Sequence, residues 1–422
     1  MRRALLALVA SAVAVLVLTG AAPPPVPDDP TDRVRSAEYW LDAYGIRTAW
    51  QTSQGAGVKI AVIDTGVGHA PELDGAVVGG TDVSGVGAAD GRTPVGAVDA
   101  NHGSWVASLA AARGTGNGDG MIGVAPAADI LSISVGFGAT SRVSFTQQVA
   151  DAMRWAVDHG AKVINLSFTT NTLDWDPSWD TAFQYAFDRD VVVVVAAGNR
   201  GSGTTRVGAP ATIPGVLTVA GLDPEGKASL EASTQGITIG VSAPSEQLLG
   251  VSADGRLVQW SGTSGAAPIV AGIVALVRAA HPDLDANNVI ERIIKTAHPA
   301  TGAKTPDPLY GYGLVDAAAA VSASVPSVET NPMGSLSDWV HLYRRAASTP
   351  QPTRDATTYT VPPLPPADAA SRPSALLPSE GTLLYGTLPL VALTAVGILV
   401  ALGVTAAVRR IRSARTPRSP SR

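Results

Sequence analysis

The sequence contains no cysteine, and only 15% of its 422 residues are charged. Without cysteine the chain cannot form disulfides, bind a metal through thiolates or carry out thiol redox chemistry. Its stability must therefore come from a hydrophobic core, and 45% of the residues are hydrophobic. The length is sufficient for one large domain with additional segments at its ends.

The chain begins with MRRALLALVASAVAVLVLTGAA, which has a basic start, an apolar run and small residues at its end. This pattern predicts a secretory signal peptide over residues 1–22. The alternative, an uncleaved anchor or a buried helix, is disfavoured by the proline-rich stretch that follows directly. We therefore expect the main domain to be exported.

A second apolar segment, residues 381–408, has no charged residue and is long enough to cross a bilayer. Six arginines follow within residues 409–422, and such clusters stay on the cytoplasmic side. We expect a single-pass anchor in the cytoplasmic membrane. The formal net charge is −5, and without the arginines of the leader and the tail the exported part carries about −13. This charge argues against a nucleic acid partner.

Between residues 55 and 321, short β-branched runs such as VKIAVID alternate with helical patterns such as VSFTQQVADAMRWAVDHG. The alternation predicts an α/β domain with a mainly parallel sheet and helices on both faces. Residues 23–54 form a polar arm before this domain. Residues 322–380 are rich in Pro, Ser, Thr and Ala, which predicts an extended linker.

Three residues could form a catalytic group. Ser264 lies in WSGTSGAAPIVAGIVALVRAA, where a loop leads into an apolar helix. A hydroxyl there could cap the helix, or it could be a nucleophile at the positive end of the helix dipole. Asp64 follows a buried strand and His102 opens a helix, although an isolated Asp at such a place is more often a turn former.

Asp64, His102 and Ser264 occur in the order Asp, His, Ser, each within its own motif. The blocks VIDTGV, HGSWVA, AAGN and GTSGAAP resemble the four signature blocks of the subtilisin-like serine proteases. The resemblance covers residues 55–321 and implies a doubly wound α/β fold. It also implies that Asp64 orients His102, that His102 is the general base and that Ser264 is the nucleophile. Asn199 of AAGN would donate to the oxyanion.

The resemblance also implies a substrate cleft between two segments, one near Ser134 and Gly136 and the other NLSFTTN. The second contributes Ser167, Phe168 and Thr169 to substrate binding. Within it, Phe168, Thr169 and Thr170 replace a Leu-Gly-Gly-like pattern of relatives, so we expect a reshaped or narrower pocket. Gly265 stands where relatives carry a larger residue, often methionine, which predicts looser packing behind Ser264.

The domain order, from signal peptide through protease domain and linker to membrane helix and basic tail, resembles that of the mycosins. These are membrane-anchored proteases of type VII secretion systems. The resemblance implies a protein or peptide substrate, contact with a type VII secretion membrane complex and no cofactor for the chemistry. A structural calcium ion, which stabilises some family members, stays open, but its ligands cannot be assigned from the sequence. Two alternatives stay open: a scaffold that stabilises a secretion complex with proteolysis secondary or lost, and a cell-surface nutrient protease.

Overall fold

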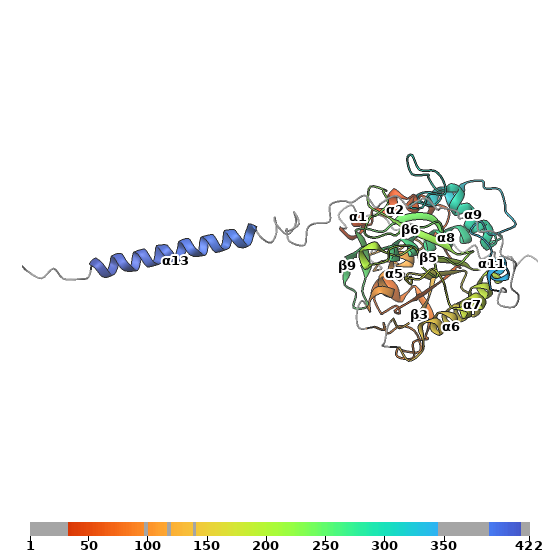
Figure 1. Cartoon of the computed structure of the whole chain (residues 1–422), viewed down its shortest axis with the longest axis horizontal. Coiled ribbons are helices and arrows are strands. Elements are labelled where there is room, and N and C mark those ends of the chain that lie inside the picture. Colours follow the sequence, from red (N-terminus) through yellow and green to blue (C-terminus); the bar gives the residue numbers. More distant parts are fainter. Residues whose placement is uncertain (1–32, 97–99, 116–119, 138–140, 345–387, 415–422) are drawn as a thin grey trace, which may run out of the picture. The chain divides into compact units, whose positions relative to one another are not determined.

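The computed structural model describes residues 33–96, 100–115, 120–137, 141–344 and 388–414. The predicted signal peptide and most of the predicted linker lie outside these ranges. The described residues belong to two units that divide near residue 351. The first unit contains the sheet and all the candidate site residues, and the second contains one long helix (Figure 1).

The first unit is built on a seven-stranded sheet with the order β2-β3-β1-β4-β5-β6-β7, in which every pair is parallel. The predicted doubly wound sheet is thus confirmed. After β1 the chain fills one side of the sheet and then crosses to fill the other, so the carboxyl end of β1 lies at the point where the winding direction changes. The strands are β1 Lys59–Asp64, β2 Val77–Asp82, β3 Asp129–Ser134, β4 Val163–Leu166, β5 Val192–Ala196, β6 Leu217–Leu222 and β7 Ile239–Pro244.

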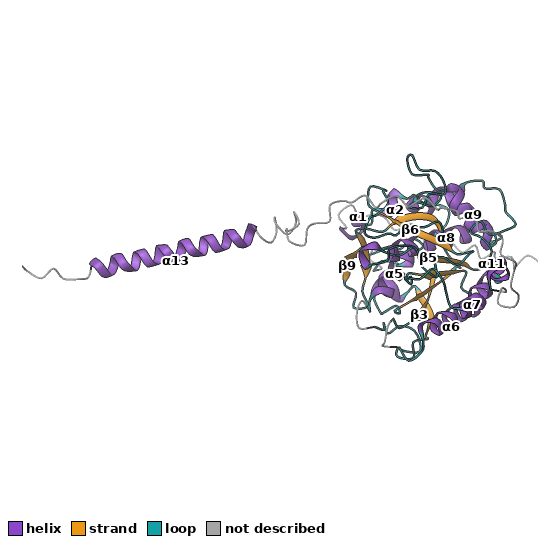
Figure 2. Cartoon of the chain, in the orientation of Figure 1, coloured by secondary structure: helices purple, strands orange, loops and turns teal. Residues whose placement is uncertain are grey.

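Helices cover both faces of the sheet (Figure 2), and each face has its own hydrophobic core. One core includes α6 (Phe145–Asp158) and α7 (Pro177–Phe187); the other includes α5 (His102–Ala111), α8 (Thr263–Ala280), α9 (Ala286–Thr296) and α10 (Ala317–Ser322). Every residue of β5 is buried, as its valine run predicts. Before α8 the chain forms an antiparallel hairpin of β8 (Leu248–Val251) and β9 (Leu257–Trp260).

The described part of the N-terminal arm is built into the core that also contains α5 and α8, as three short helices, α1 (Arg33–Ala37), α2 (Trp40–Ala43) and α3 (Ile46–Ala49). Trp40 and Leu41 have no exposed surface. The carboxylate of Glu38 accepts a hydrogen bond from the Ile122 backbone N–H at 2.7 Å. These contacts make the arm from Arg33 onward an integral part of the folded unit.

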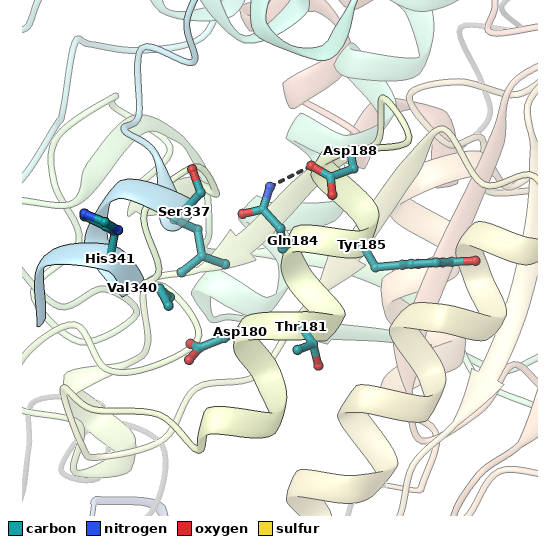
Figure 3. Close-up of a pocket in the computed structure, with 9 residues that line it drawn as sticks. Asp180, Thr181, Gln184, Tyr185, Asp188, Ser337, Val340 and His341 are labelled. Carbon is teal, nitrogen blue, oxygen red and sulfur yellow. Dashed lines mark hydrogen bonds between the residues drawn. The ribbon is translucent and has the colours of Figure 1, made fainter. Parts of the chain in front are cut away.

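The chain stays folded beyond residue 322, where the extended linker was predicted to begin. Helix α11 (Leu336–Tyr343) packs on α7: the Trp339 and Trp175 rings lie 4.4 Å apart, and Arg344 pairs with Asp180 at 2.6 Å. Prediction of a linker from composition missed this docking because it depends on a few residues, among them Leu336, Trp339 and Arg344, which barely change the composition of the segment. A pocket of about 490 Å³ between α7 and α11 (Figure 3) is lined by none of the candidate site residues.

The described part of the second unit is α13 (Leu388–Ala414), which includes a 21-residue apolar stretch, Leu390–Arg410, with a mean hydropathy of 2.4. By length and composition this helix is a candidate membrane span. Helix α8 passes the same test, but 83% of it is buried inside the first unit, so it is a core helix.

Asp190 joins three elements of the first unit. Its carboxylate accepts hydrogen bonds from Arg278 of α8, from Lys162 before β4 and from the Ala286 backbone N–H at the start of α9. Partial burial alone would raise its pKa, but the hydrogen bonds and charge of Arg278 outweigh burial and lower the pKa below its usual value.

We expect Asp190→Asn to destabilise the protein at neutral pH by about 1–3 kcal/mol, because Arg278, which is 6% exposed, loses its anionic partner. Because the pKa of Asp190 is lowered on folding, its stabilising effect is complete above the unfolded-state pKa of about 4 and is lost as the pH falls through the lower folded value. Urea unfolding at pH 7 and pH 3 measures this. An equal difference between wild type and variant at both pH values would contradict it.

Candidate active site

Asp64 and His102 form the centre of the candidate site. Asp64 ends β1 and is fully buried, whereas the His102 side chain is 22% exposed. The His102 Nδ1 lies 2.8 Å and 3.0 Å from the two carboxylate oxygens, and the Thr65 backbone N–H donates to the nearer of them at 2.7 Å. The carboxylate can thus hold the imidazole in the tautomer with its proton on Nδ1 and its lone pair on Nε2, the form that acts as a base.

The glycines of VIDTGV and HGSWVA allow this pairing. Gly66 has a φ of +100°, which favours glycine, and a Cβ at Gly103 would lie 2.5 Å from the Gly66 carbonyl oxygen. The Thr65 hydroxyl also accepts a hydrogen bond from the Gly103 N–H at 2.8 Å. Only this close approach of helix to loop brings His102 to Asp64.

Ser264 is the second residue of α8, and neither it nor Thr263 caps the helix; the capping position is Gly262. The capping interpretation of the sequence is therefore wrong. The Ser264 Oγ donates to the Ser167 carbonyl oxygen at 3.0 Å, and the Ser167 hydroxyl donates to the Ser264 carbonyl oxygen at 2.8 Å. Two reciprocal hydrogen bonds thus hold Ser264 against the end of β4.

The side-chain amide of Asn199 has a fixed orientation. Its oxygen accepts from the backbone N–H and from the hydroxyl of Thr263, both at 2.8 Å. The amide nitrogen therefore faces the loop before Ser264, where a Cβ at Gly262 would lie 2.9 Å from it. The Thr263 hydroxyl also accepts from the Gly198 N–H at 3.0 Å. This arrangement aims an N–H donor toward the nucleophile loop.

Two of the residues predicted to contact substrate are engaged elsewhere. The Ser134 side chain is fully buried and pairs weakly with the Thr81 carbonyl oxygen at 3.4 Å. The N–H and the carbonyl of Gly136 both bind the side chain of Gln148. Strand periodicity could not reveal this, because Gln148 comes from α6. The structure therefore does not place these two residues in the site.

The second predicted segment borders the site at Ser167, and the next residue, Phe168, is buried in an aromatic cluster. Phe168 is 9% exposed, and its ring packs on those of Phe145 and Phe137, 5.3 Å and 5.8 Å away. The methyl groups of Thr169 and Thr204 converge on Gly198, where a Cβ would lie 2.8 Å from each. Two branched side chains thus fill the space beside the residue that precedes Asn199.

The packing behind the nucleophile is tight, so the prediction of loose packing at Gly265 is wrong. A Cβ there would lie 2.3 Å from Leu248 Cδ1, 3.2 Å from Leu109 Cδ1 and 3.4 Å from Trp260 Cη2. Side chains from β8, α5 and β9 thus occupy the volume that a larger residue at position 265 would need. Local sequence could not reveal that other side chains fill this volume, because Leu248 and Leu109 are distant from Gly265 along the chain.

Sequence reasoning also missed Thr65, Thr263, Trp105 and Trp260. Each lies within a signature block or immediately before one, and a hydroxyl or an indole beside a reactive residue is the signal that could have found it. For the described residues, no group of three His, Asp or Glu side chains is arranged as metal ligands.

Comparison with known proteins gives the class. Residues 55–313 match the family model of peptidase S8, the subtilase family. The chain belongs to this family and is a subtilisin-like serine protease. Among its relatives, Mycosin-3 of Mycobacterium tuberculosis is 36% identical over 66% of this chain and 70% of its own length. Mycosin-4 of the same organism is 36% identical over 72% of this chain and 73% of its own length.

A solved structure of MycP1 with the N-terminal propeptide removed superposes with a TM-score of 0.59 at 30% identity, over 69% of this chain and 98% of that one. The chain is therefore related to the mycosins in both sequence and fold, as the domain order predicted.

We expect Thr263→Val to lower the turnover of a peptide substrate by about tenfold or more, because the Asn199 amide loses a partner that fixes it, while Asn199→Ala lowers turnover by about 10²–10³. Thr263→Ser keeps the hydroxyl and serves as the matched control. Steady-state kinetics of the three variants and the Asn199→Ala/Thr263→Val double variant measure this. Equal losses in Thr263→Val and Thr263→Ser, or additive losses in the double variant, would show that the hydroxyl does not act through Asn199.

Proposed function

We propose that the protein is a membrane-anchored, extracytoplasmic serine endopeptidase that hydrolyses peptide bonds through an acyl-enzyme. The observation that carries the proposal is the hydrogen bond that His102 Nδ1 donates to the buried Asp64 carboxylate, at the carboxyl end of the parallel strands, with Ser264 in the first turn of α8. A buried Asp–His pair is costly as mere structure and is typical of a base held ready for proton transfer.

In the proposed reaction, the Ser264 hydroxyl turns its proton from the Ser167 carbonyl oxygen toward His102 Nε2 and attacks the scissile carbonyl. His102 takes that proton and then gives it to the leaving amine, while Asp64 stabilises the imidazolium. The Asn199 amide N–H and the Ser264 backbone N–H, at the positive end of α8, stabilise the oxyanion. Water then hydrolyses the acyl-enzyme with His102 again as base. The chemistry as proposed requires no cofactor.

A fluorophosphonate probe tests whether Ser264 is activated, because an ordinary serine hydroxyl does not react with it. The full chain in detergent is the appropriate sample, since residues as far as Arg344 pack on the protease unit. We expect covalent labelling at Ser264, lost in Ser264→Ala, strongly reduced in His102→Ala and slowed in Asp64→Asn. A folded wild-type protein that never labels would favour the scaffold alternative.

The localisation and partners belong to the same proposal. The apolar part of helix α13 and the arginines from residue 409 onward support an anchor in the cytoplasmic membrane with the protease unit outside. A related solved structure is described as the MycP3 protease from the type VII (ESX-3) secretion system; it is 33% identical over 68% of this chain and 88% of that one, with a TM-score of 0.58. We propose that this chain serves such a membrane complex and acts on a protein or peptide substrate.

Protease treatment of spheroplasts tests the orientation. With a tag after Arg422, we expect external protease to release or digest the catalytic unit and to spare the tag, because the basic tail would lie in the cytoplasm. A cytoplasmic marker protein that stays intact serves as the control for lysis. Loss of the tag under those conditions would show that the orientation is reversed.

A further inference from the structure

Two tryptophans flank the imidazole of His102. The ring of Trp260, the last residue of β9, lies 5.6 Å from the imidazole in an edge-to-face arrangement, with an interplanar angle of 73°. The ring of Trp105, one turn along α5, lies 6.3 Å away at 61°. The two indoles also contact each other at 5.6 Å. His102 is therefore bordered by an aromatic pair in addition to Asp64.

Both indoles are anchored at their N–H groups. Trp105 Nε1 donates to the Ser252 hydroxyl at 2.9 Å, and Trp260 Nε1 donates to the Leu249 carbonyl oxygen at 3.1 Å. Both acceptors belong to the β8–β9 hairpin. Each indole is thus fixed at its polar end and presents its apolar body to the imidazole.

Glycines provide the room for this pair. A Cβ at Gly250 would lie 2.8 Å from Trp105 Cβ and 2.9 Å from Trp260 Nε1, so only glycine lets β8 approach both indoles. On the other side, Trp260 Cη2 would be 3.4 Å from a Cβ at Gly265, the residue after Ser264. The indole of Trp260 therefore lies against His102 and against the helix turn that carries Ser264.

The hairpin is attached to α5 by two more hydrogen bonds. The Asn101 side-chain oxygen accepts from the Ala253 N–H at 2.9 Å, and the Ser108 hydroxyl accepts from the Val251 N–H at 3.1 Å. Together with the bond from Trp105 to Ser252, these contacts line one face of the helix. The hairpin and the helix that begins at His102 are thus held as one body.

His102 needs such support, because it is the first residue of α5. Its side chain points back beyond the helix end, where no preceding turn confines it. The hydrogen bond to Asp64 holds the Nδ1 edge of the imidazole, and packing against the ring can restrict its rotation about that bond. A misplacement of about 1 Å in a catalytic group can cost about 10² in rate.

We propose that Trp105 and Trp260 are positioning residues, which restrict the His102 ring to the orientation in which Nδ1 faces Asp64 and Nε2 faces Ser264. This inference rests on the proposed function, since it assigns a role in aligning the base and the nucleophile. It also gives a reason for glycine at position 265, because the Trp260 indole occupies part of the space behind Ser264 that a side chain at position 265 would need.

The test measures fluorophosphonate labelling of the full chain at several probe concentrations, which separates the maximal labelling rate from the apparent affinity for the probe. We expect Trp260→Leu to lower the maximal rate by about 10- to 100-fold with little change in affinity. Trp260→Phe keeps an aromatic edge beside the imidazole and should retain most of the rate. Ser252→Ala, which frees the Trp105 indole without removing a ring, should lower the rate by several-fold.

Trp155→Leu is the matched control. Trp155 of α6 stacks on His159, with the two ring centroids 3.7 Å apart, so this variant also removes an indole beside a histidine. We expect its labelling rate to match wild type. If the wild type labels and both Trp260→Leu and Ser252→Ala label at the wild-type rate, this inference is wrong, but the proposed function still stands. A folded wild type that does not label would overturn the proposed function and this inference with it. Equal losses in Trp260→Leu and Trp260→Phe would also contradict a role for the aromatic edge.

Discussion

The buried carboxylate of Asp64 is the constraint on which the rest of the site depends. A carboxylate with no exposed surface must be compensated by donors, and here they are the Thr65 N–H and His102. The start of α5 must therefore lie against the end of β1, and the close contact between Gly66 and Gly103 makes this approach possible. Because β1 lies inside the sheet, the position of the base is set by the most buried part of the fold.

Local signals explain why much of this architecture could be predicted from the sequence. The valine run of β5 and the apolar residues of α8 are themselves signs of burial. The signature blocks identify Asp64, His102, Asn199 and Ser264 as the candidate site residues. The residues that support the site could not be predicted in this way. Leu248 behind Gly265 and Gln148 on Gly136 are chosen by packing between distant segments, which no local pattern records.

Packing between distant segments also explains why the ends of the folded unit were not predicted from the sequence. Residues after 322 have the composition of a linker, yet Trp339 and Arg344 dock α11 onto α7. At the other end, Trp40 and Leu41 place the arm inside the core that also holds α8 and α10. Both flanking segments therefore add buried surface to a domain that has no disulfide to stabilise it.

The attachment of the hairpin to α5 has a consequence for the order of folding. Its three hydrogen bonds join residues 143, 147 and 152 positions apart in the chain. Closing loops of this length costs conformational entropy, so contacts of such long sequence separation are slow to form. The surroundings of His102 are complete only once the hairpin, which follows five further strands of the sheet along the chain, has docked on α5. Incompletely folded chains would thus lack an aligned base, and the topology itself would delay activity until folding is nearly complete.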